Sequence, residues 1–230
     1  MMRMAAESGT TDIVATPHAD LTYRFQPELI RERVEELTAA AGGCPRIHEG
    51  CDFHLTYDNI QDAIANPGKY TIGHKSYLLV EFSDMLIFQN MSEIFGRMRE
   101  AGIQPVITHP ERNPLLQQRL AALERWVEEG CYIQVTAQSP LGRFGKTARA
   151  FSIELLRRNL VHFLASDAHD TKHRTPVLKD VYDWTAGEFG EGLARRLCVE
   201  NPGAAIEGTP LAAVEKDIEV SSRKWYQIWR

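Results

Sequence analysis

Apolar and polar positions follow two different spacings along the chain, and these spacings predict strands and helices in turn. Short apolar runs bounded by proline, glycine or polar residues are typical of buried strands. By this criterion the sequence predicts strands at residues 12–16, 46–53, 77–83, 105–108, 131–137 and 161–166. Proline or glycine punctuates several of these boundaries, as Pro17 does directly after the first strand.

Longer segments between these runs have apolar residues at helical spacing. Residues 27–41 are an example, because Pro27 stands at the start of the periodic segment and Gly42 follows its end. The same criteria predict helices at residues 92–102, 115–130, 148–159, 177–189 and 191–201. The Asn-Pro-Gly cluster within residues 201–208 predicts a turn region.

The alternation of strands with helices indicates the fold class. Parallel strands joined by right-handed helical crossovers give this order in α/β proteins. Because no linker or low-complexity stretch divides the chain, a barrel or barrel-like sheet is favoured over two separate domains. We assign residues 1–211 to one domain and residues 212–230, which end in WYQIWR, to a C-terminal extension.

Composition narrows the class of function. The chain has 230 residues, of which 43% are hydrophobic and 25% are charged, and its net charge is −5. This acidic balance argues against a nucleic-acid partner. No apolar run approaches the roughly 18 residues that a membrane span needs, so we expect no direct membrane insertion. Four cysteines without a CxxC pair, and a start without a signal peptide, predict reduced thiols and a cytoplasmic protein.

Side chains that bind metals occur at the ends of five predicted strands. In parallel sheets and barrels, functional residues gather at the carboxyl ends of the strands. The candidates in chain order are His18, Asp52, His54, Glu81, His109, Glu111, Arg112, Asp167, His169, His173 and Arg174. A single histidine beside a strand is more often structural, and Glu81 alone could form an internal salt bridge. The convergence of five strand ends favours a functional site.

The types of these side chains indicate the chemistry. Imidazole and carboxylate ligands without cysteine suit divalent Mn, Fe or Zn, and two or three such ions could share this set. Neighbouring cations acidify a bound water and hold the oxygens of a phosphoryl group. Arg112 and Arg174 carry planar donor forks suited to phosphate, the alternative for each being a surface ion pair.

Four stretches of the sequence resemble one known family. ATPH at 15–18, PVITHPERN at 105–113, EEGCYIQV at 128–135 and HFLASDAH at 162–169 are similar to the bacterial protein-tyrosine phosphatases of the PHP (polymerase and histidinol phosphatase) superfamily. The resemblance runs from about residue 5 to about residue 211. It implies a distorted (β/α)7 barrel that hydrolyses phosphotyrosine with metals, typically Mn²⁺. It also implies, as substrate, a tyrosine autokinase of capsule or exopolysaccharide biosynthesis.

The resemblance also implies roles for individual residues. A metal-bound hydroxide would be the nucleophile, and Arg112 and Arg174 would bind the substrate phosphate. Asp52 stands where the family usually has glutamate, whose side chain is one methylene longer. The implied metal ligands are His18, Asp52, Glu81, His109, Asp167 and His169.

The sequence departs from the family at its start. Family members open with a strand that carries His-x-His, whereas no histidine precedes His18 here. We therefore expect the first barrel strand and part of the ligand set to be absent, and we interpret the given start as a truncated one.

Two alternative functions follow from these observations. The first is a phosphatase of the same superfamily that acts on small esters of the histidinol-phosphate type. The second is a degenerate protein that binds a partner without catalysis, which the absent His-x-His would explain. A cysteine-based phosphatase is not indicated, because the positions six residues after the four cysteines hold Gly50, Tyr57, Ala137 and Ala204 rather than arginine.

Overall fold

The computed structural model describes residues 1–212, so the C-terminal extension lies outside the described residues except for Ala212. It has a six-stranded sheet in the order β2-β4-β5-β6-β7-β8 and a separate pair, β1-β3. All neighbouring strands are parallel. The strands are β1 (Asp12–Ala15), β2 (His18–Ala19), β3 (Arg46–Glu49), β4 (Asp52–His54), β5 (Tyr77–Glu81), β6 (Gln104–Thr108), β7 (Tyr132–Thr136) and β8 (Phe163–Ala165).

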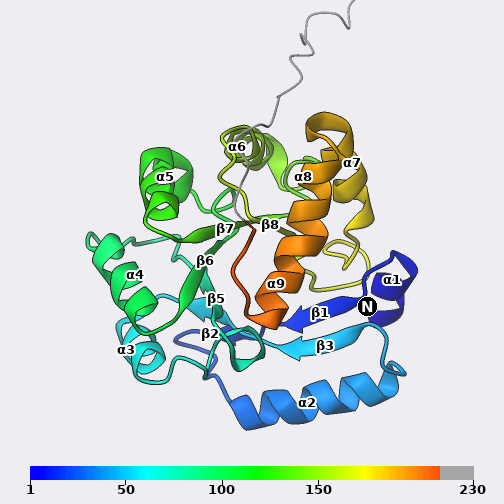
Figure 1. Cartoon of the computed structure of the whole chain (residues 1–230), viewed down its shortest axis with the longest axis horizontal. Coiled ribbons are helices and arrows are strands. Elements are labelled where there is room, and N and C mark those ends of the chain that lie inside the picture. The colour runs from blue at the N-terminus through cyan, green and yellow to red at the C-terminus, as the bar shows by residue number, and fades with distance from the viewer. Residues whose placement is uncertain (213–230) are drawn as a thin grey trace, which may run out of the picture.

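Helices connect the strands and lie outside the curved sheet, with α3 to α6 forming an arc around it (Figure 1). From β4 onward a helix separates each strand from the next, which confirms the expected parallel α/β class. The helices are α1 (Met2–Glu7), α2 (Pro27–Ala40), α3 (Tyr57–Ala65), α4 (Met91–Glu100), α5 (Leu120–Glu128), α6 (Gly145–Arg157), α7 (Lys179–Phe189), α8 (Glu191–Arg195) and α9 (Asn201–Glu207), with a π-helix at Arg196–Glu200 and 3₁₀ turns at Ile72–His74 and Leu116–Gln118.

The structure corrects three predictions of local structure. The strand expected at 46–53 is broken at Gly50 and Cys51 into β3 and β4, and α3 was not predicted. The segment 201–208 is the helix α9 and not a turn region. Pro202 lies in the first turn of α9, where a backbone N–H is not needed, and Gly208 ends the helix in a left-handed conformation with φ of 71°.

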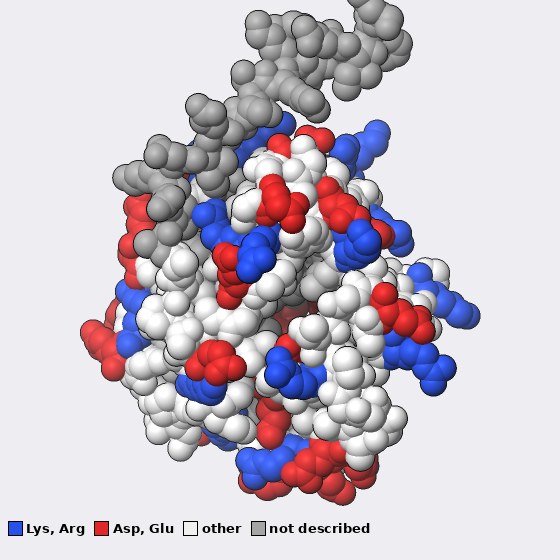
Figure 2. Space-filling model, turned by 45° about the vertical axis from the view of Figure 1, so that its right-hand side comes forward, with Lys and Arg blue, Asp and Glu red and all other residues white. Residues whose placement is uncertain are grey.

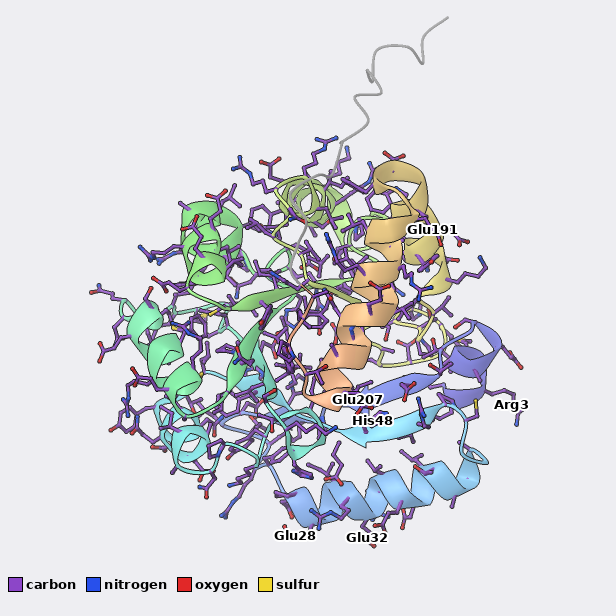
Figure 3. All side chains as sticks on the ribbon, viewed as in Figure 1. Arg3, Glu28, Glu32, His48, Glu191 and Glu207 are labelled. Carbon is purple, nitrogen blue, oxygen red and sulfur yellow. The ribbon has the colours of Figure 1, made fainter. Side chains whose placement is uncertain are left out.

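The core lies between the sheet and its outer helices. In β6 and β7 every residue except the first is buried, as expected for parallel strands covered on both faces. Helix α4 buries Met91, Ile94, Phe95 and Met98, a spacing that places them on one face of the helix. Helix α2 has no buried residue, and Figure 3 shows Glu28 and Glu32 on its side facing away from the strands.

The six-stranded sheet stays open between its two edges. Among the described residues, no strand pairs with the outer edge of β2 or of β8. A cavity of about 1060 Å³ lies between these edges, lined by apolar side chains such as Val106 and Phe163 and by the ends of β2 and β8. Figure 2 shows a hollow on this side of the molecule with Asp or Glu atoms in its depth.

No helix in the described part of the chain combines the length and the apolar character that crossing a membrane requires.

Candidate metal centre

Strand register places four candidate ligands together. His18 of β2 is the register partner of Asp52 in β4, and His54 of β4 is the partner of Glu81 in β5. The side chains meet accordingly, with 3.0 Å between His18 Nδ1 and Asp52 Oδ2 and 2.7 Å between His54 Nε2 and Glu81 Oε2. One nitrogen or oxygen from each residue lies within 4.8 Å of the others, close enough to hold one metal ion.

Electrostatics in this cluster favour a cation. Burial and the charge of Glu81 raise the pKa of Asp52, because two carboxylates face each other. Burial acts most strongly on Glu81 and would raise its pKa, but the contact with His54, the charge of His109 and the contact with Asp52 together outweigh burial and lower that pKa. The hydrogen bond between His54 and Glu81 raises the pKa of His54. Without a metal ion, protons on Asp52 and His54 therefore offset the negative charge of the cluster. A bound cation would take the place of these protons.

His109 joins the cluster from the end of β6. Its Nε2 is 3.5 Å from Glu81 Oε1, and its side chain is mostly buried. Burial lowers the pKa of His109, so the ring favours the neutral form that a metal ligand needs. The backbone N–H of His109 donates to the Gln134 carbonyl at 2.8 Å, which fixes the chain as it leaves the sheet.

Asp167 forms a second group with the two arginines. Arg112 and Arg174 both donate to Asp167 Oδ2, which brings a loop after β6 and a loop after β8 together. His169 Nδ1 lies 3.0 Å from the Asp167 carbonyl oxygen and 3.9 Å from Asp167 Oδ1, and its side chain is half exposed. Asp167 and His169 thus lie beside the arginines instead of within the four-residue cluster.

Both arginines are held by further contacts. The guanidinium of Arg112 lies over the ring of Phe144, 4.5 Å from its centroid. Asp170 closes the turn that presents Arg174, since its Oδ1 accepts the backbone N–H groups of Lys172 and His173 at 2.6 Å each. These contacts keep two cationic forks at the carboxyl end of the sheet.

The backbone is strained at two of the predicted ligands. His109 has φ of 34° and Asp167 has φ of 47°, in the left-handed region that side chains with a Cβ rarely adopt. Each residue directly follows or closely follows a strand, β6 or β8. Strained conformations of this kind concentrate at functional sites.

Glu111 points into the core although it stands between His109 and Arg112. Its side chain is fully buried, and its Oε1 accepts the backbone N–H of Thr136 at 3.0 Å and the hydroxyl of Ser139 at 2.6 Å. Burial raises the pKa of Glu111 to about 7. Glu111 therefore ties the loop after β6 to β7 and serves the fold.

The structure brings the predicted site residues to one region. The cavity between β2 and β8 is lined by His18, Asp52, His109, Asp167 and His169. Glu81 is not part of this lining but contacts two of these residues, His18 at 3.6 Å and His109 at 3.5 Å. His54 was among the strand-end candidates, but the set of metal ligands implied by the family resemblance omitted it. Asp52 and His54 are two residues apart in a strand and so point to the same face, which is the signal that would have included it.

The residues present suit a divalent cation. Asp52 Oδ1 is buried and has no hydrogen-bond partner among the described residues. An unpaired buried oxygen is costly unless a cation or donor occupies the site. The donor set of imidazole nitrogens and carboxylate oxygens matches Mn, Fe or Zn.

The cysteines are unsuited to nucleophilic catalysis. All four are free thiols. Burial raises the pKa of Cys51, Cys131 and Cys198, which keeps these thiols protonated.

Comparison with known proteins places this geometry in a wider group. A chain from the solved structures of YwqE of Bacillus subtilis and CpsB of Streptococcus pneumoniae, described as metal-dependent tyrosine phosphatases, superimposes with a TM-score of 0.85. The two chains are 29% identical, and the match covers 92% of this chain and 87% of the other. The parallel α/β fold and the histidine–carboxylate cluster thus define a PHP-type protein, as expected from the sequence.

Sequence comparison then gives the family. Residues 1–207 match the family model for capsular polysaccharide synthesis, CpsB/CapC, and the chain belongs to this family. The tyrosine-protein phosphatase YwqE of Bacillus subtilis is 31% identical over 201 residues, which are 84% of this chain and 77% of the relative. The tyrosine-protein phosphatase CpsB of Streptococcus pneumoniae is 29% identical over 211 residues, which are 86% of this chain and 85% of the relative.

Proposed function

We propose that this protein hydrolyses phosphotyrosine on other proteins, with water as the nucleophile and divalent cations, Mn²⁺ above all, as cofactors. The observation that carries the proposal is the pair of register contacts, His18 with Asp52 and His54 with Glu81, beside two arginine forks. The names of YwqE and CpsB as tyrosine phosphatases support the choice of substrate.

The proposal assigns two groups of residues to two tasks. His18, Asp52, His54, Glu81 and His109 would hold metal, and Asp167 and His169 would complete the set next to the arginines. When bound, divalent cations lower the pKa of water and neutralise the charge of a phosphoryl group.

The arginines bind and orient the phosphate in this proposal. Arg112 and Arg174 donate to one carboxylate oxygen of Asp167, so their forks already converge on one point. A phosphate that replaced Asp167 as their acceptor would receive hydrogen bonds from both guanidinium groups and would leave the Asp167 carboxylate free to hold metal. The oxygen of water then bonds to phosphorus, the bond to the tyrosine oxygen breaks, and the tyrosine oxygen takes up a proton.

We further propose that the physiological partner is a tyrosine autokinase of polysaccharide biosynthesis and that the reaction takes place in the cytoplasm. The capsular polysaccharide synthesis family to which the chain belongs supports this choice.

Hydrolysis by purified protein with added Mn²⁺ tests the proposal. We expect a phosphotyrosine peptide to be hydrolysed with a higher kcat/KM than a small ester of the histidinol-phosphate type. A preference for the small ester by orders of magnitude would overturn the assignment in favour of a metabolite phosphatase. Absence of turnover on both substrates would instead support a degenerate protein that only binds its partner.

A further inference from the structure

Exposed apolar side chains are concentrated after three neighbouring strands. In the described chain, more than half of the large apolar side chains that remain exposed follow β2, β4 or β5. They are Leu21, Tyr23, Tyr57, Met85 and Leu86, which we call the apolar rim. Leu21 is 93% exposed and Met85 is 90% exposed, so neither side chain contributes to the hydrophobic core. Grouped exposed apolar residues mark interaction sites.

The apolar rim borders the candidate metal centre. The strands that precede it carry His18, Asp52, His54 and Glu81. The ring of Tyr23 stacks on that of His18, with 6.5 Å between centroids and 26° between planes. The arginine forks come from the loops after β6 and β8, further along the same sheet edge. The site therefore has an apolar flank over β2, β4 and β5 and a cationic flank over β6 and β8.

Local turns hold the rim residues outward. Asp20 Oδ1 accepts the backbone N–H groups of Thr22 at 2.7 Å and Tyr23 at 2.6 Å, and this turn presents Leu21. Ser83 Oγ accepts the backbone N–H of Met85 at 3.1 Å in the loop after β5. The exposed apolar side chains are thus presented by structured turns.

An aspartate adjoins an apolar residue in each of the three segments. Asp20 precedes Leu21, Asp58 follows Tyr57, and Asp84 precedes Met85. These three aspartates outnumber the exposed Arg24 that follows Tyr23. Their charge would repel an acidic residue placed on the rim, whereas Arg112 and Arg174 attract the phosphate. The charge pattern therefore favours the phosphate at the cationic flank of the site and disfavours an acidic residue at the apolar flank.

We propose that the apolar rim binds the polypeptide next to the substrate phosphotyrosine, with preference for an apolar residue there and against an acidic one. This inference rests on the proposed phosphotyrosine hydrolysis and adds a determinant of substrate choice. In this arrangement the phosphate contacts Arg112 and Arg174, while a neighbouring apolar side chain of the substrate packs on Leu21 or Met85. A small ester has no flanking chain and makes no contact with the rim.

Two peptides that differ only next to the phosphotyrosine test the inference. One carries leucine at the adjacent positions and the other carries glutamate, and p-nitrophenyl phosphate serves as a substrate without flanking residues. All are assayed with added Mn²⁺ on the wild type, on the double variant Leu21→Ser/Met85→Ser, and on Leu29→Ser. Leu29 is an exposed leucine of α2, outside the rim and outside the cavity lining, and provides the matched control.

The wild type is expected to favour the leucine peptide. The double variant should lose roughly tenfold in kcat/KM on that peptide, mainly through KM, because it removes two apolar side chains that the leucine peptide would cover on binding. Its kcat/KM on p-nitrophenyl phosphate should match the wild type, and so should all values measured for Leu29→Ser. Equal kcat/KM of the wild type on the two peptides would overturn the proposed role of the apolar rim. So would a double variant whose kcat/KM on the leucine peptide equals that of the wild type.

The test separates failure of the rim from failure of the proposed function. If the wild type turns over none of the three substrates, the hydrolysis proposal fails. Fluorescence anisotropy with the same labelled phosphopeptides then measures binding directly. Weaker binding of the glutamate peptide, and loss of the difference in Leu21→Ser/Met85→Ser, would still support the rim, and equal binding of both peptides would overturn it.

Discussion

At the scale of single residues, the segment PVITHPERN gives three neighbouring side chains three different surroundings. His109 contacts Glu81, Glu111 is buried against Thr136 and Ser139, and Arg112 contacts Asp167. The turn after β6, in which the Arg112 N–H donates to the His109 carbonyl at 2.9 Å, separates these directions. One short stretch thus supplies a candidate ligand, a structural carboxylate and a candidate phosphate-binding arginine.

These different surroundings predict different outcomes for two substitutions. His109→Ala should lose bound metal, because it removes a neutral imidazole from the cluster. Arg112→Ala should keep its metal content and lose roughly a hundredfold in kcat on a phosphotyrosine peptide, as removal of one transition-state donor does elsewhere. Metal analysis by mass spectrometry and steady-state kinetics on the same preparations measure both effects.

Arg119→Ala is the matched control, since Arg119 is an exposed arginine of the same loop region. It should retain both metal and turnover. Equal loss of metal in His109→Ala and Arg112→Ala would contradict the separate roles.

Much of the candidate site could be predicted at this scale. The residue types at the strand ends indicated His18, Asp52, Glu81 and His109, and the structure places all of them around one cluster. The sequence pattern could not predict whether a side chain in a turn points toward the core or toward the site. Glu111 has the same ligand chemistry as its neighbours, and only the tertiary contacts of its carboxylate show that it faces the core.

At the scale of elements, the broken strand pair β1–β3 and β2–β4 positions the cluster. The register is the same before and after the break, with Asp12 opposite Arg46 and His18 opposite Asp52. Gly50 lies at the break, packed so closely that a Cβ there would be 2.6 Å from Val14 Cγ1. A glycine is therefore required where the strands change sheets.

Gly50→Ala should destabilise the protein by about 1–3 kcal/mol through overpacking. In the Val14→Ala background, Gly50→Ala should cost less stability than it does in the wild type, because the clashing methyl group of Val14 is gone. Chemical denaturation of the four proteins of this cycle measures the coupling. Additive effects of the two substitutions would show that the close approach at Gly50 does not determine the break.

The sequence pattern predicted the existence of most elements but not their exact type or ends. The strongly periodic helices and the apolar strands β5 to β8 were predicted because burial imposes their spacing. Segment 201–208 was predicted as a turn from Asn-Pro-Gly, yet packing of Ala205 against Ile72, Val106 and Phe163 stabilises a helix there. Tertiary contacts outweighed local propensity at this position.

At the scale of the whole molecule, the sheet edges β2 and β8 face a common cavity that contains five of the predicted site residues. The sequence predicted a barrel with its first strand absent, and the described residues form an open six-stranded sheet of the PHP type. The cluster forms despite this opening, because its contacts depend on the register of β2, β4 and β5.

The most direct test of this account is the metal content of the purified, folded protein after incubation with Mn²⁺ and dialysis, measured by mass spectrometry. The account predicts at least about one equivalent of tightly bound metal in the wild type and less in His54→Ala, because ligand count sets affinity. Less than about one equivalent in a wild-type protein with native circular dichroism would contradict the metal centre, and with it the hydrolysis proposed for this chain.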